Sequence, residues 1–157
     1  MSKFSVTLEV EPGEALRSFS PSETRDLCKR WMESFGKNGG VNTKAYLWHV
    51  FSWGMNPCLS LREATEEYEK QTAPSFIVMS NDRKQAIETN RRPLRSGVAD
   101  WVVFPPNFAW TMAFTHEDGW LGPYFARHEH YERLNEENAA KIRKVEAIEA
   151  ARKNGWL

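Results

Sequence analysis

The stretch THEDGWLGPYF, residues 115–125, concentrates side chains whose types and spacing suit chemistry. An imidazole beside two carboxyl groups, His116 with Glu117 and Asp118, has the residue types of a general acid–base pair. Acidic residues before a glycine also occur in ordinary turns, because their side chains bond to the nearby backbone. The stretch therefore has two interpretations, an acid–base site or a turn that carries a binding surface.

Catalysis at this stretch would need partners that the sequence does not signal. Acyl transfer needs a nucleophile, and the available Ser52, Cys58 and Thr115 stand in no motif such as the strained elbow of a hydrolase. Nucleotide-phosphate loops of the GxGxxG or GxxxxGK[ST] kind are absent from the sequence. We therefore expect no catalytic residue and no cofactor.

A metal site would need several imidazole and carboxyl groups that converge at about 2 Å on one ion. The histidines are His49, His116, His128 and His130, and their spacing matches no zinc pattern. We expect His128 and His130 to be exposed on the first turns of the last helix, pointing in different directions. The sequence thus predicts no metal site.

Aromatic residues are the remaining functional signal. Trp120 and Tyr124 lie in a loop rich in glycine and proline, where side chains tend to face solvent. Exposed aromatic rings next to charged groups are typical of a binding hot spot. An equally weighted alternative is that they cap the open end of a sheet with their polar tips in water. The first interpretation gives these binding residues: His49, Trp53, His116, Glu117, Asp118, Trp120 and Tyr124.

Composition narrows the class of protein. The 157 residues fit one domain, residues 1–157, with 41% hydrophobic and 27% charged residues. The net charge of zero, from 21 basic and 21 acidic side chains, argues against a nucleic-acid partner and removes one barrier to a homodimer. A local cluster of basic residues at positions 83–95 keeps an RNA contact open as a minor alternative. Two cysteines without CxxC spacing and the absence of a membrane-length apolar run predict a cytoplasmic protein without a membrane partner.

The first third of the chain predicts a strand and two helices. Residues 4–10 alternate apolar and polar side chains, as a half-buried strand does, and Pro12-Gly13 ends the run. Residues 20–35 predict a helix with Ser20 as N-cap, a capping box with Glu23, and an apolar stripe. Residues 43–53 are too densely apolar to distinguish helix from strand, and we favour a helix.

The rest of the chain predicts a further helix, two hairpins and a long final helix. A second capping box, Ser60 with Glu63, would start a helix whose inner face holds Leu61, Ala64 and Tyr68. Residues 81–83 and 106–107 are turns between apolar strands, which predicts two hairpins. Residues 126–154 predict one helix with a thin apolar seam that includes Val145 and Ile148 and breaks around residues 137–141. Such a helix either lies along the sheet or partly projects from it, or it serves as a dimerisation or partner helix. This order predicts an α+β fold, a mainly antiparallel sheet with helices on one side and a long C-terminal helix.

Two motifs carry a resemblance to a known family. LWHVFS, residues 47–52, together with THE and GPYF, residues 115–117 and 122–125, resembles a family of small bacterial domains of unknown function. The likeness covers most of residues 20–127, and the last helix looks like an addition. The resemblance implies no activity, but it implies that His49 and His116-Glu117 belong to one shared design. A buried His49 bonded to an acid near His116 would be one such use.

Together these observations favour a small intracellular protein of the immunity or antitoxin kind, which binds another protein such as a toxin. The single domain, the lack of catalytic motifs and the aromatic loop support this function. The alternative is a small hydrolase or metal-dependent enzyme centred on His116 and Glu117 with His49.

Overall fold

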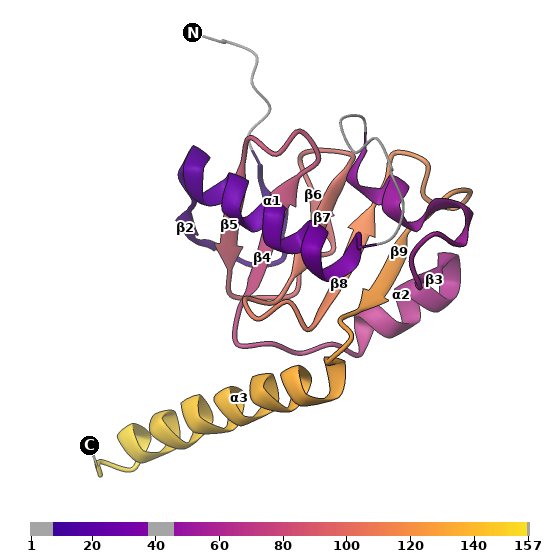
Figure 1. Ribbon diagram of the computed structural model, residues 1–157. Helices are drawn as coiled ribbons and strands as arrows, with labels where there is room; N and C mark the ends of the chain where they lie inside the picture. The colour runs from indigo at the N-terminus through magenta and orange to yellow at the C-terminus, as the bar shows by residue number, and fades with distance from the viewer. Residues whose placement is uncertain (1–7, 38–45, 157) are drawn as a thin grey trace, which may run out of the picture.

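The protein, described by a computed structural model over residues 8–37 and 46–156, is built around a seven-stranded antiparallel sheet (Figure 1). Its order is β2-β5-β4-β7-β8-β9-β3, and a separate two-stranded sheet pairs β1 with β6. The predicted α+β class with a mainly antiparallel sheet is confirmed. The strands are β1 (Val10–Glu11), β2 (Ala15–Ser18), β3 (Leu59–Ser60), β4 (Phe76–Ser80), β5 (Ala86–Thr89), β6 (Arg95–Ser96), β7 (Trp101–Phe104), β8 (Trp110–Phe114) and β9 (Tyr124–Arg127).

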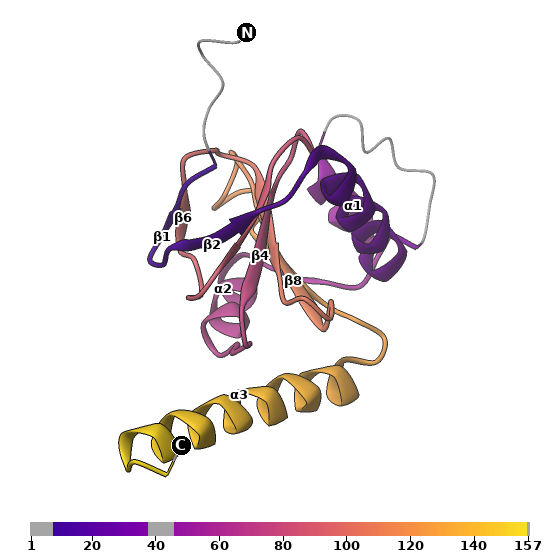
Figure 2. The ribbon, with the colours of Figure 1, turned by 90° about the vertical axis from the view of Figure 1, so that its left-hand side faces the viewer.

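Helices cover both faces of this sheet, so the expectation that they lie on one side is wrong (Figure 2). Helix α1 (Pro21–Phe35) and the 3-10 helix η1 (Leu47–Gly54) pack on one face; α2 (Leu61–Glu69) and the start of α3 (Tyr131–Lys153) pack on the other. The reason lies in the central strands β4 and β7, whose successive side chains are all buried and, apart from Ser80, apolar. Alternate residues of such a strand point to opposite faces, and each face therefore needs a cover.

Helix α1 has the predicted signals and the predicted apolar stripe. Ser20 accepts a hydrogen bond from the Glu23 amide at 3.1 Å, and the Glu23 carboxylate accepts one from the Ser20 amide at 2.8 Å. Trp31 is fully buried, and its indole N–H donates to Thr111 Oγ1 in β8 at 2.9 Å. The stripe thus attaches α1 to the centre of the sheet.

Both predicted hairpins are present. Strands β4 and β5 pair across the turn that contains residues 81–83, where Arg83 takes a positive φ of 63°. Strands β7 and β8 pair across the turn at residues 106–107. In this second turn Asn107 donates through its side chain to the Leu134 carbonyl at 2.8 Å, which attaches α3 to the sheet.

The N-terminal strand is shorter than predicted among the described residues. Leu8 is buried as expected, but the strand β1 covers Val10–Glu11 alone, and Phe4 and Val6 lie outside the described residues. After Gly13 the chain continues into β2, an exposed edge strand that the sequence pattern did not indicate. An edge strand with one neighbour needs no alternating burial, which is why its pattern carries little signal.

The capping box predicted at Ser60 is wrong, although helix α2 follows it. Ser60 belongs to β3, pairs with Tyr124, and makes no side-chain cap bond. Leu61 has a positive φ of 56° and donates its amide to the Pro123 carbonyl at 3.0 Å. The residue directly before strand β9 thus provides a hydrogen-bond acceptor for the first amide of the helix. Leu61 is 42% exposed, so it does not lie on the inner face with Ala64 as predicted.

The last helix begins later than predicted. Residues 124–127 form strand β9 between β8 and β3, and α3 starts at Tyr131. His128 and His130 therefore precede the helix, and His128 is half-buried, with its Nδ1 accepting the His130 amide at 3.0 Å. Pairing with two neighbouring strands outweighs the helix propensity of a short apolar segment.

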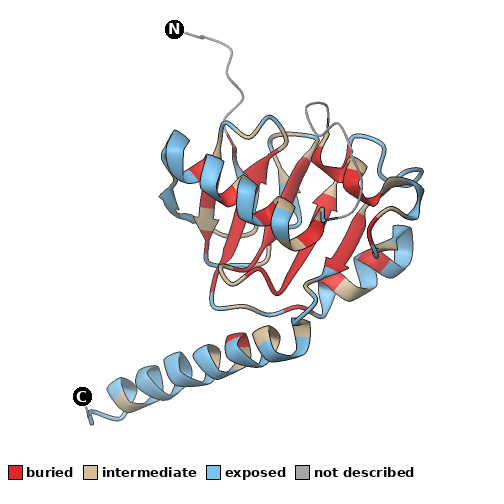
Figure 3. Cartoon of the chain, in the orientation of Figure 1, coloured by how far each residue is buried: buried red, intermediate tan, exposed pale blue. Residues whose placement is uncertain are grey.

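Most of α3 projects from the body of the protein (Figure 3). Asn138 is buried and donates to Asn107 at 3.3 Å, whereas the seam residues Val145 and Ile148 are 50% and 37% exposed. The partly projecting helix is one of the two arrangements that the broken seam predicted. No helix in residues 8–37 and 46–156 combines the length and apolar character needed to cross a membrane.

The capping of α1 gives a direct test. We expect Ser20→Ala to lower the free energy of unfolding by about 1 kcal/mol, because the first turn loses a cap acceptor. Ser60→Ala is the matched control and should change it by less than about 0.5 kcal/mol, since the Ser60 side chain caps nothing. Urea denaturation measures both, and equal losses in the two variants would contradict the capping assignment.

Candidate functional site

Helix η1 forms one wall of a cavity. Its irregular backbone explains why the sequence of residues 43–53 does not distinguish helix from strand. Its described part, from Tyr46 onward, is a short 3-10 helix, in agreement with the favoured helix; residues 43–45 lie outside the described residues. Trp48 and Phe51 are buried against the sheet. The helix breaks at Ser52, which is extended, and at Trp53, which has a φ of 61°. This break turns the Trp53 ring outward, where it is 96% exposed.

A tight turn at residues 115–122 forms the opposite wall. The Asp118 carboxylate accepts from the Thr115 amide at 2.9 Å and from its hydroxyl at 3.1 Å, while Thr115 Oγ1 accepts the Glu117 amide at 3.0 Å. Gly119 has a φ of +97°, and a Cβ on Gly122 would lie 2.9 Å from Thr115 Cγ2. Asp118 thus serves the turn itself, and burial raises the pKa of its carboxyl while the Thr115 bonds oppose the rise.

Asp100 joins the two walls, and the sequence analysis missed it. Its carboxylate accepts the Trp48 indole N–H at 3.0 Å and the His116 amide at 3.0 Å. The same carboxylate bonds the Nδ1 of His116 at 2.9 Å. The available signal was weak: one polar residue directly before the buried strand that starts at Trp101.

The Asp100–His116 pair perturbs the imidazole. The hydrogen bond to Asp100 raises the pKa of His116, and the charges of Asp100, Glu117 and Asp118 add to the rise while desolvation opposes it. With Nδ1 held by Asp100, the Nε2 atom lies 3.9 Å from Glu117 Oε1. Such an arrangement orients an imidazole and leaves one ring nitrogen for a proton or a ligand.

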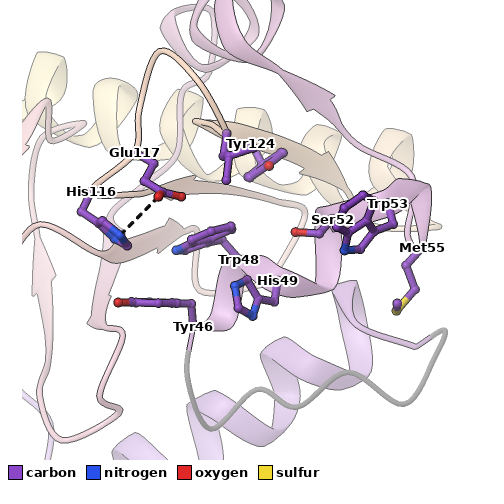
Figure 4. Close-up of a pocket in the computed structure, with 10 residues that line it drawn as sticks. Tyr46, Trp48, His49, Ser52, Trp53, Met55, His116, Glu117 and Tyr124 are labelled. Atoms are coloured by element: carbon purple, nitrogen blue, oxygen red, sulfur yellow. Dashed lines mark ion pairs between the residues drawn. The ribbon is translucent and has the colours of Figure 1, made fainter.

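Between the two walls lies a cavity of about 540 Å³ (Figure 4). Aromatic rings dominate it: Tyr46 stacks on Trp48 at 5.3 Å between centroids, and Trp48 stacks on Tyr124 at 6.1 Å. Its lining is Tyr46, Trp48, His49, Ser52, Trp53, Met55, His116, Glu117, Leu121 and Tyr124. The two motifs of the sequence therefore contribute to one cavity.

His49 and His116 line this cavity without bonding to one another. The His49 ring lies edge-on to Trp48 at 4.5 Å and to Tyr46 at 5.5 Å, and the His116 ring lies 4.9 Å from Tyr46. The acid that bonds near His116 is Asp100, and it bonds His116 rather than the half-buried His49. Aromatic rings thus connect the two histidines, where a hydrogen bond from His49 to an acid was expected.

The predicted aromatic surface divides into buried and exposed members. Tyr124 is 8% exposed because it lies in β9, so its expected place on the surface is wrong. Burial raises the pKa of its hydroxyl, and a hydrogen bond with Ser52 opposes that rise. Trp120 is 83% exposed, as a surface loop predicts, and Trp53, at the break in η1, is 96% exposed.

The nucleophile candidates lie in unpromising surroundings. Thr115 is buried within the turn, and Ser52 bonds the Tyr124 hydroxyl. Cys58 is half-buried, and burial raises the pKa of its thiol, which disfavours the reactive thiolate. Within residues 8–37 and 46–156, no group of three or more His, Cys, Asp or Glu side chains is arranged to hold a metal ion.

Comparison with known proteins places most of this site inside one family model. The model described as "Domain of unknown function (DUF4275)" matches residues 29–125, which include both motifs and Asp100. Helix α3 lies beyond the matched residues. No curated protein and no solved structure matches the chain.

The Asp100–His116 pair predicts a pH dependence. Because the His116 pKa is raised in the folded state, the Asp100–His116 pair contributes its full stabilisation below about pH 6.5, the ordinary pKa of histidine. This contribution is lost as the pH rises through the folded-state pKa of His116. In Asp100→Asn the His116 pKa should fall towards its ordinary value, because the amide carries no charge. NMR titration of the His116 ring protons measures the His116 pKa in wild type and in Asp100→Asn.

Asp26→Asn is the control for this titration, since Asp26 is an exposed residue of α1 on another element. It should leave the His116 titration unchanged. A His116 pKa that is the same in wild type and Asp100→Asn would refute the role assigned to Asp100.

Proposed function

The chain belongs to the DUF4275 family, whose description assigns no activity, and we propose that it is a small protein-binding domain of the immunity or antitoxin kind. In this proposal it acts in the cytoplasm, where it binds and neutralises a partner protein such as a toxin. The recognition surface is the cavity with two exposed tryptophans, Trp53 in its lining and Trp120 in the turn beside it. Recognition of this kind needs a pre-formed surface rather than chemistry.

The observation that carries the proposal is the exposure of these two indoles. Trp53 is 96% exposed and itself lines the cavity. Trp120 is 83% exposed and lies in the turn of Glu117, whose carbonyl accepts the Trp120 amide at 3.0 Å. Large aromatic rings in water lose the free energy that burial would provide, and tryptophan is enriched at the energetic centres of interfaces.

The rigidity of the surface also supports binding. Asp100 holds both walls, and the turn of Glu117 is closed by the Asp118–Thr115 bonds. A surface that is ordered before binding loses little conformational entropy when a partner arrives. The same exposed rings on a mobile loop would bind more weakly.

A second candidate function, a small hydrolase centred on His116 and Glu117 with His49, draws support from one observation. The Asp100–His116 pair has the hydrogen-bonded geometry of a carboxylate that orients a general base. No hydrogen bond joins His116 to Ser52 in the described part of the chain, and Trp48 lies between them (Figure 4). The missing nucleophile makes this the weaker candidate.

The binding function predicts a selective loss of affinity. Trp53→Ala and Trp120→Ala should each weaken partner binding about thirtyfold, which corresponds to a hot-spot loss of about 2 kcal/mol. Both variants should keep the wild-type melting temperature, because the rings are exposed. The partner is captured from the native host on the wild-type chain, and its affinity for each variant is measured by calorimetry.

Trp156→Ala is the matched control, since this ring is 75% exposed at the far end of α3. It should bind the partner like wild type.

Expression of the captured protein alone should harm the host, and co-expression with this chain should relieve the harm. Failure to capture a protein, with a small molecule that raises the melting temperature instead, would reject the binding function.

The hydrolase candidate has its own test. If it is correct, His116→Ala should abolish turnover of at least one ester, amide or phosphoester substrate that the wild-type chain hydrolyses. The exposed His130→Ala serves as control, because His130 lies outside the cavity. Equal turnover by wild type and His116→Ala across the panel would remove the candidate.

A further inference from the structure

Carboxylates outnumber cationic groups among the described residues around the cavity. Glu117 is the carboxylate in its lining, its side chain is 43% exposed, and neither lysine nor arginine is among the lining residues, all of which the structure describes. Asp100 lies behind His116 with its side chain 15% exposed. His116 pairs with Asp100 through Nδ1 at 2.9 Å, and its Nε2 is 3.9 Å from Glu117 Oε1, so two carboxylates surround one imidazole. A partner group that enters here therefore meets negative charge.

The aromatic rings around that charge suit the same kind of group. The electron-rich face of an aromatic ring attracts a cation, most strongly for tryptophan and where water is excluded. Trp53 presents an indole that is 96% exposed, and Trp48 and Tyr124 stack at 6.1 Å in the cavity lining. Figure 4 shows the Glu117 carboxylate above the Trp48 indole. Rings and carboxylate thus line one cavity, which is open to solvent on the side of Trp53.

The remaining lining suits an aliphatic stem. Met55 and Leu121 provide apolar surface, and lysine and arginine bury their methylene chains on such surface while their heads keep polar partners. A cavity of about 540 Å³ has room for a long side chain. An acidic group would be repelled by Glu117, and an apolar group would leave the carboxylate desolvated and unpaired.

We propose that this cavity binds a positively charged side chain, lysine or arginine, of the partner protein, with Glu117 as counter-charge and the aromatic rings as walls. This inference rests on the proposed protein-binding function, since it names the group by which the partner is recognised. Trp53 covers the stem, and the head lies against Glu117. Asp100 holds Nδ1 of His116 at 2.9 Å, which leaves the Glu117 carboxylate as the counter-charge for the ligand.

Small amides test the cavity without any partner. The full chain is titrated with N-acetyl-argininamide and N-acetyl-lysinamide, and with neutral N-acetyl-norleucinamide of similar length, while NMR follows the Trp48 indole and the Glu117 amide. The cationic amides should bind at least about fivefold more tightly than the neutral one, as a cation–π contact and a charge pair require. Added salt should weaken their binding.

Glu117→Gln should reduce the affinity for both cationic amides about fivefold and leave the norleucinamide affinity unchanged. Glu63→Gln, an exposed acid in the first turn of α2, is the control and should bind like wild type. Norleucinamide that binds as tightly as the cations, or cation affinity that is equal in wild type and Glu117→Gln, would overturn the proposal.

The two proposals can fail separately. Binding of the cationic amides, together with capture experiments that retain no protein, would uphold the charge preference of the cavity and reject the protein-binding function. A captured partner whose affinity depends on Trp53 but is the same for wild type and Glu117→Gln would uphold the protein-binding function and reject the charge preference of the cavity.

Discussion

The carboxylate of Asp100 is the constraint on which the site depends. It stands directly before β7, receives the Trp48 indole from η1, and receives both the amide and the ring of His116 from the turn after β8. Its backbone carbonyl accepts the Asn81 amide, which adds the β4–β5 turn. Charge-assisted bonds of this kind are stronger than neutral ones. One side chain therefore sets the separation of the two cavity walls.

The aromatic residues around Asp100 are of two kinds, buried rings that pack in the core and exposed rings that face solvent. Trp48 and Tyr124 lie buried in the stacked wall, whereas Trp53 is turned outward by the break at the end of η1. The backbone that carries the exposed indole is thus anchored by buried residues of the same short helix, Trp48 and Phe51. A ligand that meets such a surface finds its contacts already in place, and binding costs less ordering.

Much of the fold was predictable, because its signals are local. The α1 cap and its apolar stripe, both hairpins and the α+β class follow from patterns within one element or one turn. The errors occur where distant strands pair. Ser60 has the sequence of a helix cap but pairs with Tyr124, and residues 124–127 become a strand because β8 and β3 lie on either side. A segment's own propensity does not reveal such neighbours.

The candidate site divides in the same way. The sequence by itself determined that His116, Glu117 and Trp120 share one tight turn and that His49 and Trp53 share one short segment, since these relations depend on adjacency in the chain. Only the tertiary structure decided that the two segments face one cavity, that Tyr124 is buried, and that Asp100 joins the walls. Asp100 lies 52 positions from Trp48 and 16 from His116. Contacts over such separations form only when the sheet register brings the strands together, and no local pattern encodes that register.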